Sequence, residues 1–153
     1  MTWIVSDRYP MAGGLVLATP MVLAEDWAGV HNAPELRGED FVATGVAGEV
    51  FQPRVAGASR LAVRLTITGA VDDDGDPVEV PDVGLRTAIA VLVAAVTTTT
   101  ATKEFRDVFS DGSYLAAQCV MSLGPCRPLD DYTVAAVLDV KNLSGIWTLT
   151  AAP

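Results

Sequence analysis

The chain has 153 residues, enough for one domain with a substantial hydrophobic core. Its net charge of −9 argues against a protein that holds nucleic-acid phosphates or anionic membranes through clustered lysine and arginine. Half of the residues are hydrophobic and the mean hydropathy is +0.36, so we expect apolar surface that other subunits cover.

Export and membrane insertion are not expected from the sequence. The N-terminus carries Asp7 and Arg8 after only a few apolar residues, unlike a signal peptide. The longest apolar run, residues 88–96, is far shorter than the roughly 20 residues that span a bilayer. Cys119 and Cys126 are too few for a disulfide framework. They could pair across the intervening turn, but two free cysteines in a reduced compartment are the favoured interpretation. We therefore expect synthesis in the cytoplasm.

The first third of the chain predicts short strands. Residues 3–5 are typical of a strand, and residues 7–14 form a turn-rich break. Residues 15–23 alternate weakly around Pro20, which predicts one strand with a bulge or an edge position. Residues 24–34 are expected to form a loop.

Residues 36–55 predict an extended hairpin, which we call the arm. Two short extended pieces flank a turn that contains Gly45 and Gly48. The apolar content is too small to hold such a hairpin as an independent unit, so it must lie on the parent domain or on a neighbouring subunit.

Residues 59–96 are the stretch around which the chain is organised. Residues 59–68 alternate between apolar and polar, which predicts a strand buried on one face. The acidic turn 72–77 follows. Apolar residues then recur at helical spacing over about 82–96, with Asp82 as the candidate N-cap. The side chains expected to pack this helix on a sheet are Leu85, Ile89, Leu92 and Val96.

The last third predicts further antiparallel strands. Asp111 and Gly112 indicate a two-residue hairpin turn that would set Phe109 opposite Tyr114 and Val108 opposite Leu115. The strands are expected over residues 102–109, 114–123, 132–140 and 146–150. Runs of strands around a lone helix predict a mainly β fold, an antiparallel sandwich or barrel with one flanking helix, in a single domain over residues 1–153.

Catalytic and metal-binding patterns are weak, and we expect no enzyme and no cofactor. A calcium loop with Gly75 at its sixth position fails at Ala70 and Pro81, which favours a solvated turn. His31 stands alone in a loop. The chain holds no nucleophile elbow and no phosphate-binding glycine loop. The scattered tryptophans indicate core or interface packing.

The order of these features resembles a known family. An early tryptophan strand precedes Arg37-Gly38-Glu39-Asp40 at the start of the arm, and Pro53-Arg54 precedes the long strand. A Thr-Gly end, an acidic turn and a helix that begins near Gly84-Leu85 follow. This layout, from about Trp3 to Val140, resembles the short distal or minor tail proteins of long-tailed bacteriophages of actinobacteria.

The resemblance implies a tail-tube-like fold that closes into a six-membered ring at the distal end of the tail in the virion. It implies no catalytic residue. Its partners would be copies of itself, the tail tube, the tape measure and the tip or baseplate proteins, with DNA passing through the lumen without specific binding. The arm would contact neighbouring subunits through Arg37, Glu39, Asp40, Phe41, Phe51 and Arg54. Alternatives are a tail tube or tail terminator subunit, or a small carbohydrate- or protein-binding module.

Overall fold

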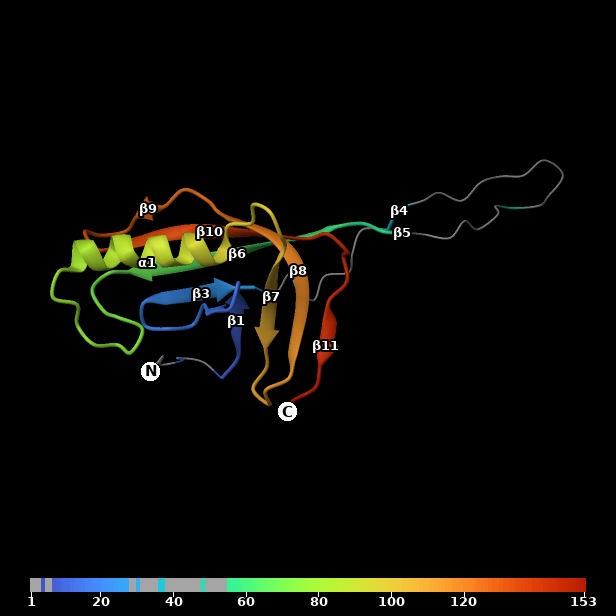
Figure 1. Cartoon of the computed structure of the whole chain (residues 1–153), viewed down its shortest axis with the longest axis horizontal. Coiled ribbons are helices and arrows are strands. Elements are labelled where there is room, and N and C mark those ends of the chain that lie inside the picture. The colour runs from blue at the N-terminus through green and yellow to red at the C-terminus, as the bar shows by residue number, and fades with distance from the viewer. Residues whose placement is uncertain (1–3, 5–6, 28–29, 31–35, 38–47, 49–54) are drawn as a thin grey trace.

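The computed structural model describes residues 4, 7–27, 30, 36–37, 48 and 55–153. In these residues the chain is mainly β. A nine-stranded antiparallel sheet curls into a half-barrel, and one helix, α1 (Pro81–Val96), packs on its inner side (Figure 1). The predicted class, an antiparallel sandwich or barrel with a flanking helix, is confirmed.

The sheet runs in the order β2-β1-β7-β8-β10-β6-β3, while β11 pairs with β8 and β9 pairs with β10. Every strand pair of this sheet in the described residues is antiparallel, in agreement with the predicted antiparallel fold. The strands are β1 (Tyr9–Ala12), β2 (Leu15–Val16), β3 (Val22–Asp26), β6 (Ser59–Thr68), β7 (Lys103–Val108), β8 (Tyr114–Leu123), β9 (Arg127–Pro128), β10 (Thr133–Asn142) and β11 (Thr148–Thr150).

β6 and β10 form the centre of the sheet. They pair over ten residues, from Thr133 opposite Thr68 to Asn142 opposite Ser59. Along both strands alternate side chains are buried, because the period of a strand is two and only the inner face meets the helix. The predicted alternation over residues 59–68 is therefore observed.

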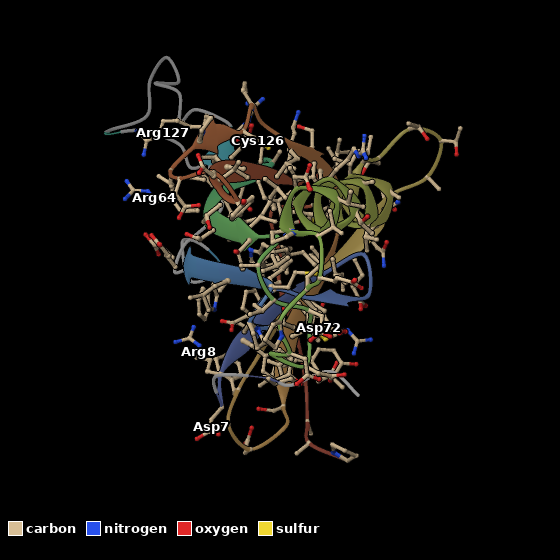
Figure 2. The ribbon with its side chains drawn as sticks, turned by 90° about the vertical axis from the view of Figure 1, so that its left-hand side faces the viewer. Asp7, Arg8, Arg64, Asp72, Cys126 and Arg127 are labelled. Carbon is tan, nitrogen blue, oxygen red and sulfur yellow. The ribbon has the colours of Figure 1, made fainter. Side chains whose placement is uncertain are left out.

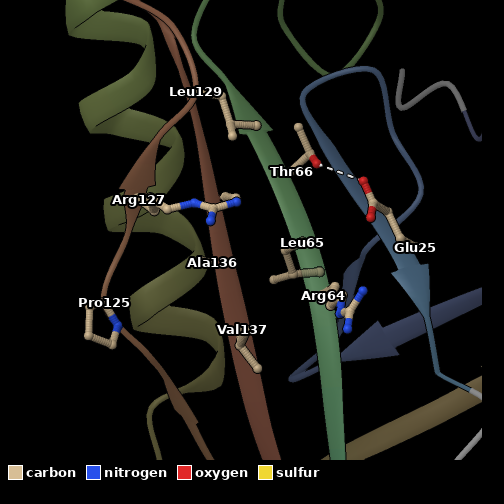
Figure 3. Close-up of a pocket in the computed structure, with 10 residues that line it drawn as sticks. Glu25, Arg64, Leu65, Thr66, Pro125, Arg127, Leu129, Ala136 and Val137 are labelled. Atoms are coloured by element: carbon tan, nitrogen blue, oxygen red, sulfur yellow. Dashed lines mark hydrogen bonds between the residues drawn. The ribbon is translucent and has the colours of Figure 1, made fainter.

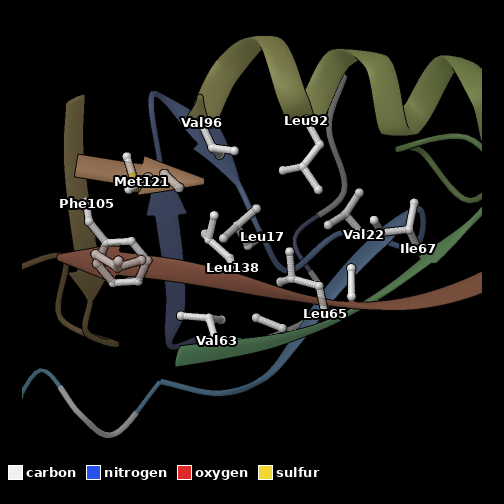
Figure 4. Close-up of a cluster of buried hydrophobic side chains, with 14 of the residues drawn as sticks. Leu17, Val22, Val63, Leu65, Ile67, Leu92, Val96, Phe105, Met121 and Leu138 are labelled. Carbon is white, nitrogen blue, oxygen red and sulfur yellow. The ribbon is translucent and has the colours of Figure 1, made fainter. Parts of the chain in front are cut away.

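The core lies between this inner face and α1. Leu92 and Val96 of the helix are fully buried against β6, β8 and β10 (Figure 4). Phe105 of β7 closes one end, with its ring centroid 5.9 Å from that of Trp147 in an edge-to-face arrangement. The remaining fully buried large apolar residues are Leu17, Val22, Val63, Leu65, Ile67, Met121 and Leu138.

The start of α1 differs from the prediction. Asp82 is not the N-cap, because the helix begins at Pro81 and Val80 occupies the cap position without a side-chain hydrogen bond. Proline is favoured at the first helical position, since it lacks an N–H that would have no partner there. Asp82 instead accepts a hydrogen bond from the Val83 N–H, 2.9 Å. Val93 also matches the helical spacing of α1, but its side chain is 39% exposed, so it lies outside the buried side of the helix.

Two glycines bring the first turn of α1 against the end of β6. A Cβ added at Gly69 would lie 2.1 Å from the Pro81 carbonyl oxygen, and one added at Gly84 would lie 2.6 Å from the Gly69 carbonyl oxygen. Both contacts are with backbone, which has little freedom to move aside. The helix therefore approaches the strand at a distance that only glycine permits.

Replacing Gly84 with alanine should destabilise the domain by about 1–3 kcal/mol, because the added methyl group forces α1 away from β6. Helix propensity alone would give the opposite sign, a gain of about 1 kcal/mol. Urea unfolding measures the difference. Ala90→Gly, at an exposed position of the same helix, is the control and should cost only the propensity difference. A stabilised Gly84→Ala variant would contradict the contact.

The N-terminal strands also differ from the prediction. Residues 9–12 lie in the expected break but form β1, which Gly13 and Gly14 join to β2 as a two-residue hairpin loop with positive φ of 58° and 83°. Residues 15–23 are two strands, because the chain turns at residues 18–21, where the Thr19 N–H donates to the Val22 carbonyl. Of the strand predicted at residues 3–5, only Ile4 is described.

The β7–β8 hairpin has a loop one residue longer than predicted. Val108 lies opposite Tyr114, so the predicted pairing of Val108 with Leu115 is wrong. The Phe109 N–H donates to the Ser113 carbonyl oxygen, and Gly112, with φ of 87°, ends a three-residue loop. A turn followed by a glycine in the left-handed region is the usual geometry of such loops.

Candidate interaction surfaces

The arm is described only at its base. β4 (Leu36–Arg37) pairs antiparallel with β5 (Val55–Ala56), apart from the main sheet and beyond the end of β6 (Figure 1). Arg37 is thus placed in β4. The other predicted arm contacts lie outside the described residues; they are Glu39, Asp40, Phe41, Phe51 and Arg54.

The helix residues singled out in the sequence all lie on the side of α1 that faces the sheet. Leu92 and Val96 are fully buried, and Leu85 and Ile89 are partly buried against the same core. Ala88 lies among them and is also buried. These side chains hold the helix in place rather than offer a surface to a partner.

The outer face of the sheet carries a group of basic side chains that we call the basic face. β6 contributes Arg60 and Arg64 from its exposed positions, β10 contributes Lys141, and β9 contributes Arg127. Among the described residues, no acceptor forms a hydrogen bond or an ion pair with any of these side chains. Lys141 lies directly opposite Arg60 across the β6–β10 pair.

A shallow depression of about 570 Å³ lies on this face (Figure 3). Arg64 stands on one side of it and Arg127 reaches from β9 across β10 on the other. Glu25 of β3 accepts a hydrogen bond from the Thr66 hydroxyl, 3.1 Å. Apolar side chains of Val137 and Leu129 are 39% and 51% exposed beside the two arginines. The depression combines positive charge with apolar area, as protein interfaces do.

One flank of α1, beside the β2–β3 turn, carries an apolar groove of about 530 Å³. The helix contributes Val83 and Val91, which are 43% and 45% exposed, and the β2–β3 turn contributes Met21. The loop before the helix forms the rim. Residues 72–82 comprise this loop and the first two residues of α1, and we call them the acidic loop. They hold six carboxylates and no basic residue: Asp72, Asp73, Asp74, Asp76, Glu79 and Asp82.

The acidic loop is held in shape by hydrogen bonds between its own residues. One carboxylate oxygen of Asp72 accepts hydrogen bonds from the N–H groups of Asp74 and Asp76, at 3.0 and 2.9 Å. The Asp72 N–H donates to the Asp76 carbonyl oxygen, 2.9 Å. No group of three or more side chains that could hold a metal ion is present in the described part of the chain.

A buried ion pair ties the N-terminal segment to β7. The guanidinium of Arg8 donates two hydrogen bonds to Asp107, at 3.2 and 2.7 Å, and the Trp27 indole N–H donates a third, 3.0 Å. Asp107 is fully buried. The hydrogen bond from Arg8 to this carboxylate raises the pKa of the guanidinium above its usual value. Sequence reasoning missed this cluster.

The two cysteines are both free, as expected, and do not pair across the turn between them. Cys119 lies in the core and Cys126 is exposed beside Arg127. Burial raises the pKa of the Cys119 thiol to about 12, so it holds its proton at neutral pH.

Alkylation of the native protein should therefore modify Cys126 alone. Because the thiolate is the reactive form and Cys119 is both buried and protonated, a folded sample treated with iodoacetamide should gain one label, and an unfolded sample two. Mass spectrometry of the intact chain and its peptides measures the outcome. Rapid labelling of Cys119 in the folded state would contradict its place in the core.

The arrangement of the sheet and the helix is also found in a protein of known structure. The structure is similar to the crystal structure of SPP1 Dit (gp 19.1), described as a paradigm of the hub adsorption apparatus in phages that infect Gram-positive bacteria. The TM-score is 0.58 at 14% sequence identity, over 92% of this chain and 51% of the Dit chain, so this chain spans about half of that protein. Identity at this level shows a shared fold.

No protein-family model and no curated protein matches the sequence. Among the helices of the described residues, none is long and apolar enough to cross a membrane.

Proposed function

We propose that this chain is a structural subunit of a bacteriophage tail, at the distal end of the tail tube, where it connects the tube to the tip. The observation that carries the proposal is the fold that it shares with SPP1 Dit over 92% of its length. Exposed apolar side chains on the outer face of the sheet and in the α1 groove support this proposal, because such surfaces are typical of proteins that bind neighbouring subunits.

In this role the chain forms a ring, six-membered in the family that the sequence resembles, the distal or minor tail proteins of actinobacterial phages. Its partners are copies of itself, the tail tube, the tape measure and the tip or baseplate proteins of the virion. The arm that starts at β4 and β5 would contact neighbouring subunits. A net charge of −9 disfavours retention of DNA that passes through the lumen.

Two measurements test the proposal. Native mass spectrometry and sedimentation velocity of the purified chain should show a discrete, concentration-dependent ring species, with six copies expected. Gold-labelled antibodies against the chain should mark the distal end of the tail on virions in electron micrographs. Labelling along the whole tube would indicate a tube subunit, and labelling at the head-proximal end a terminator. A monomer at high concentration that labels no virion would overturn the proposal.

A further inference from the structure

The basic face and the α1 groove lie on different sides of the molecule. α1 covers the inner face of β6 and β8, so outward side chains of β6 point away from the helix. In Figure 2, Arg64 and Arg127 project from one edge of the chain, and Asp72 lies apart from them, near the middle of the view. A surface on one side cannot meet the other within one copy, but it can meet it on the next.

The two sides are complementary in charge. The basic face holds four cations, and the acids beside them are Glu25, Asp139 and Asp26, the last of which lies opposite Arg64 in the β3–β6 pair. The acidic loop holds six carboxylates and no cation. Within a chain of net charge −9, the basic face is therefore a local exception, and the acidic loop carries a large share of the negative charge. Opposite potentials of this kind steer and orient association.

Repulsion between like charges within the basic face destabilises the isolated subunit. Arg60 and Lys141 lie directly opposite each other across β6 and β10. Like charges directly opposite each other destabilise a sheet. No described side chain relieves the repulsion through an ion pair. A negatively charged partner docked on the face would relieve it.

Both sides also expose apolar side chains of similar extent. Val137 and Leu129 lie on the basic face, and Val83 and Val91 line the groove next to the acidic loop. Phosphates of a nucleic acid would satisfy the cations but would leave these apolar side chains uncovered. A protein surface that presents carboxylates beside aliphatic side chains fits both features, and this chain has one.

We propose that the basic face of one copy docks on the acidic loop and α1 groove of the next copy. Because the two surfaces are different and lie apart on the molecule, the contact is head-to-tail and repeats in one direction, which gives a closed ring when the rotation between copies divides a full turn. The inference rests on the proposed ring function and names the surfaces that join its subunits.

Charge exchange tests the contact. The face variant is Arg60→Glu/Arg64→Glu, and the loop variant is Asp76→Lys/Glu79→Lys; all four side chains are exposed, and the one hydrogen bond at Asp76 is made by its backbone N–H. Each variant places like charges together and should weaken self-association at least roughly tenfold, since like-charge contacts across an interface suppress association. The combined variant, with the wild-type net charge, should recover assembly, as should an equimolar mixture of the face and loop variants. Sedimentation velocity at low and high salt measures this, with thermal melts to verify folding.

The outcomes separate the inference from the proposed function. If the wild type assembles and both variants assemble equally well, the contact assigned here is wrong while the ring stands. If the wild type is monomeric at all concentrations, the ring itself is wrong. If the wild type binds duplex DNA and only the face variant loses that binding, the basic face serves phosphates and the inference is overturned. Weakened assembly of each single variant, with recovery in the combined variant and in the mixture, supports the head-to-tail contact.

Discussion

Leu92→Asp should abolish the cooperative unfolding transition. Leu92 is fully buried among side chains of the sheet at the centre of the core. Truncating a buried leucine costs about 2–5 kcal/mol through lost burial and the cavity, and an unpaired buried carboxylate adds a further penalty. The sum reaches the net stability of a domain, roughly 5–15 kcal/mol. Circular dichroism during heating should show no sigmoidal transition.

Val93→Asp is the matched control for this experiment. The residue is the next one in the same helix but is 39% exposed, and it does not line the α1 groove. The same chemical change there should lower the unfolding free energy by about 1 kcal/mol or less. A Leu92→Asp variant that melts near the wild type would mean that α1 does not hold the core.

Arg8→Ala should lower the unfolding free energy by about 3 kcal/mol, the lower end of the cost of breaking a buried ion pair. The variant leaves the carboxylate of Asp107 fully buried without its cationic partner, while the Trp27 indole N–H still donates to it. The lower end applies because Arg8 itself is 43% exposed, so water solvates part of the guanidinium. Urea unfolding measures the loss.

A double-mutant cycle separates the charge from the packing of Arg8. Asp107→Asn removes the buried charge, so Arg8→Ala in that background should cost much less than in the wild type. Equal costs in both backgrounds would show that the arginine acts through its contacts with the rings of Trp27 and Phe109, whose centroids lie 5.9 and 5.3 Å from the guanidinium carbon.

The centre of the fold was predictable because its patterns are long. Ten residues of alternation in β6 and the helical spacing of α1 each repeat often enough to exclude another structure. β1 was missed because Pro10 and the two glycines after the strand outweigh four residues of weak pattern. The β7–β8 register was missed because Asp111 and Gly112 suit loops of two or three residues equally well.

The surfaces were predictable only in part. Alternation places Arg60 and Arg64 on one face of β6, but Lys141 joins them only through the pairing register of β10. Arg127 comes from β9, a two-residue strand with no pattern to read. The ion pair of Arg8 with Asp107 joins residues 99 positions apart, and no local pattern specifies such a distance.

The exposed thiol on the outer surface gives the chain a native reporter. Cys126 stands between Pro125 and Arg127, both of which line the depression on that surface. A fluorophore attached there through a maleimide needs no engineered residue, because the other thiol, that of Cys119, is buried in the core. Its emission and its accessibility to quenchers would follow, in real time, how much of the outer face of the sheet becomes covered when the protein associates with itself or with a partner.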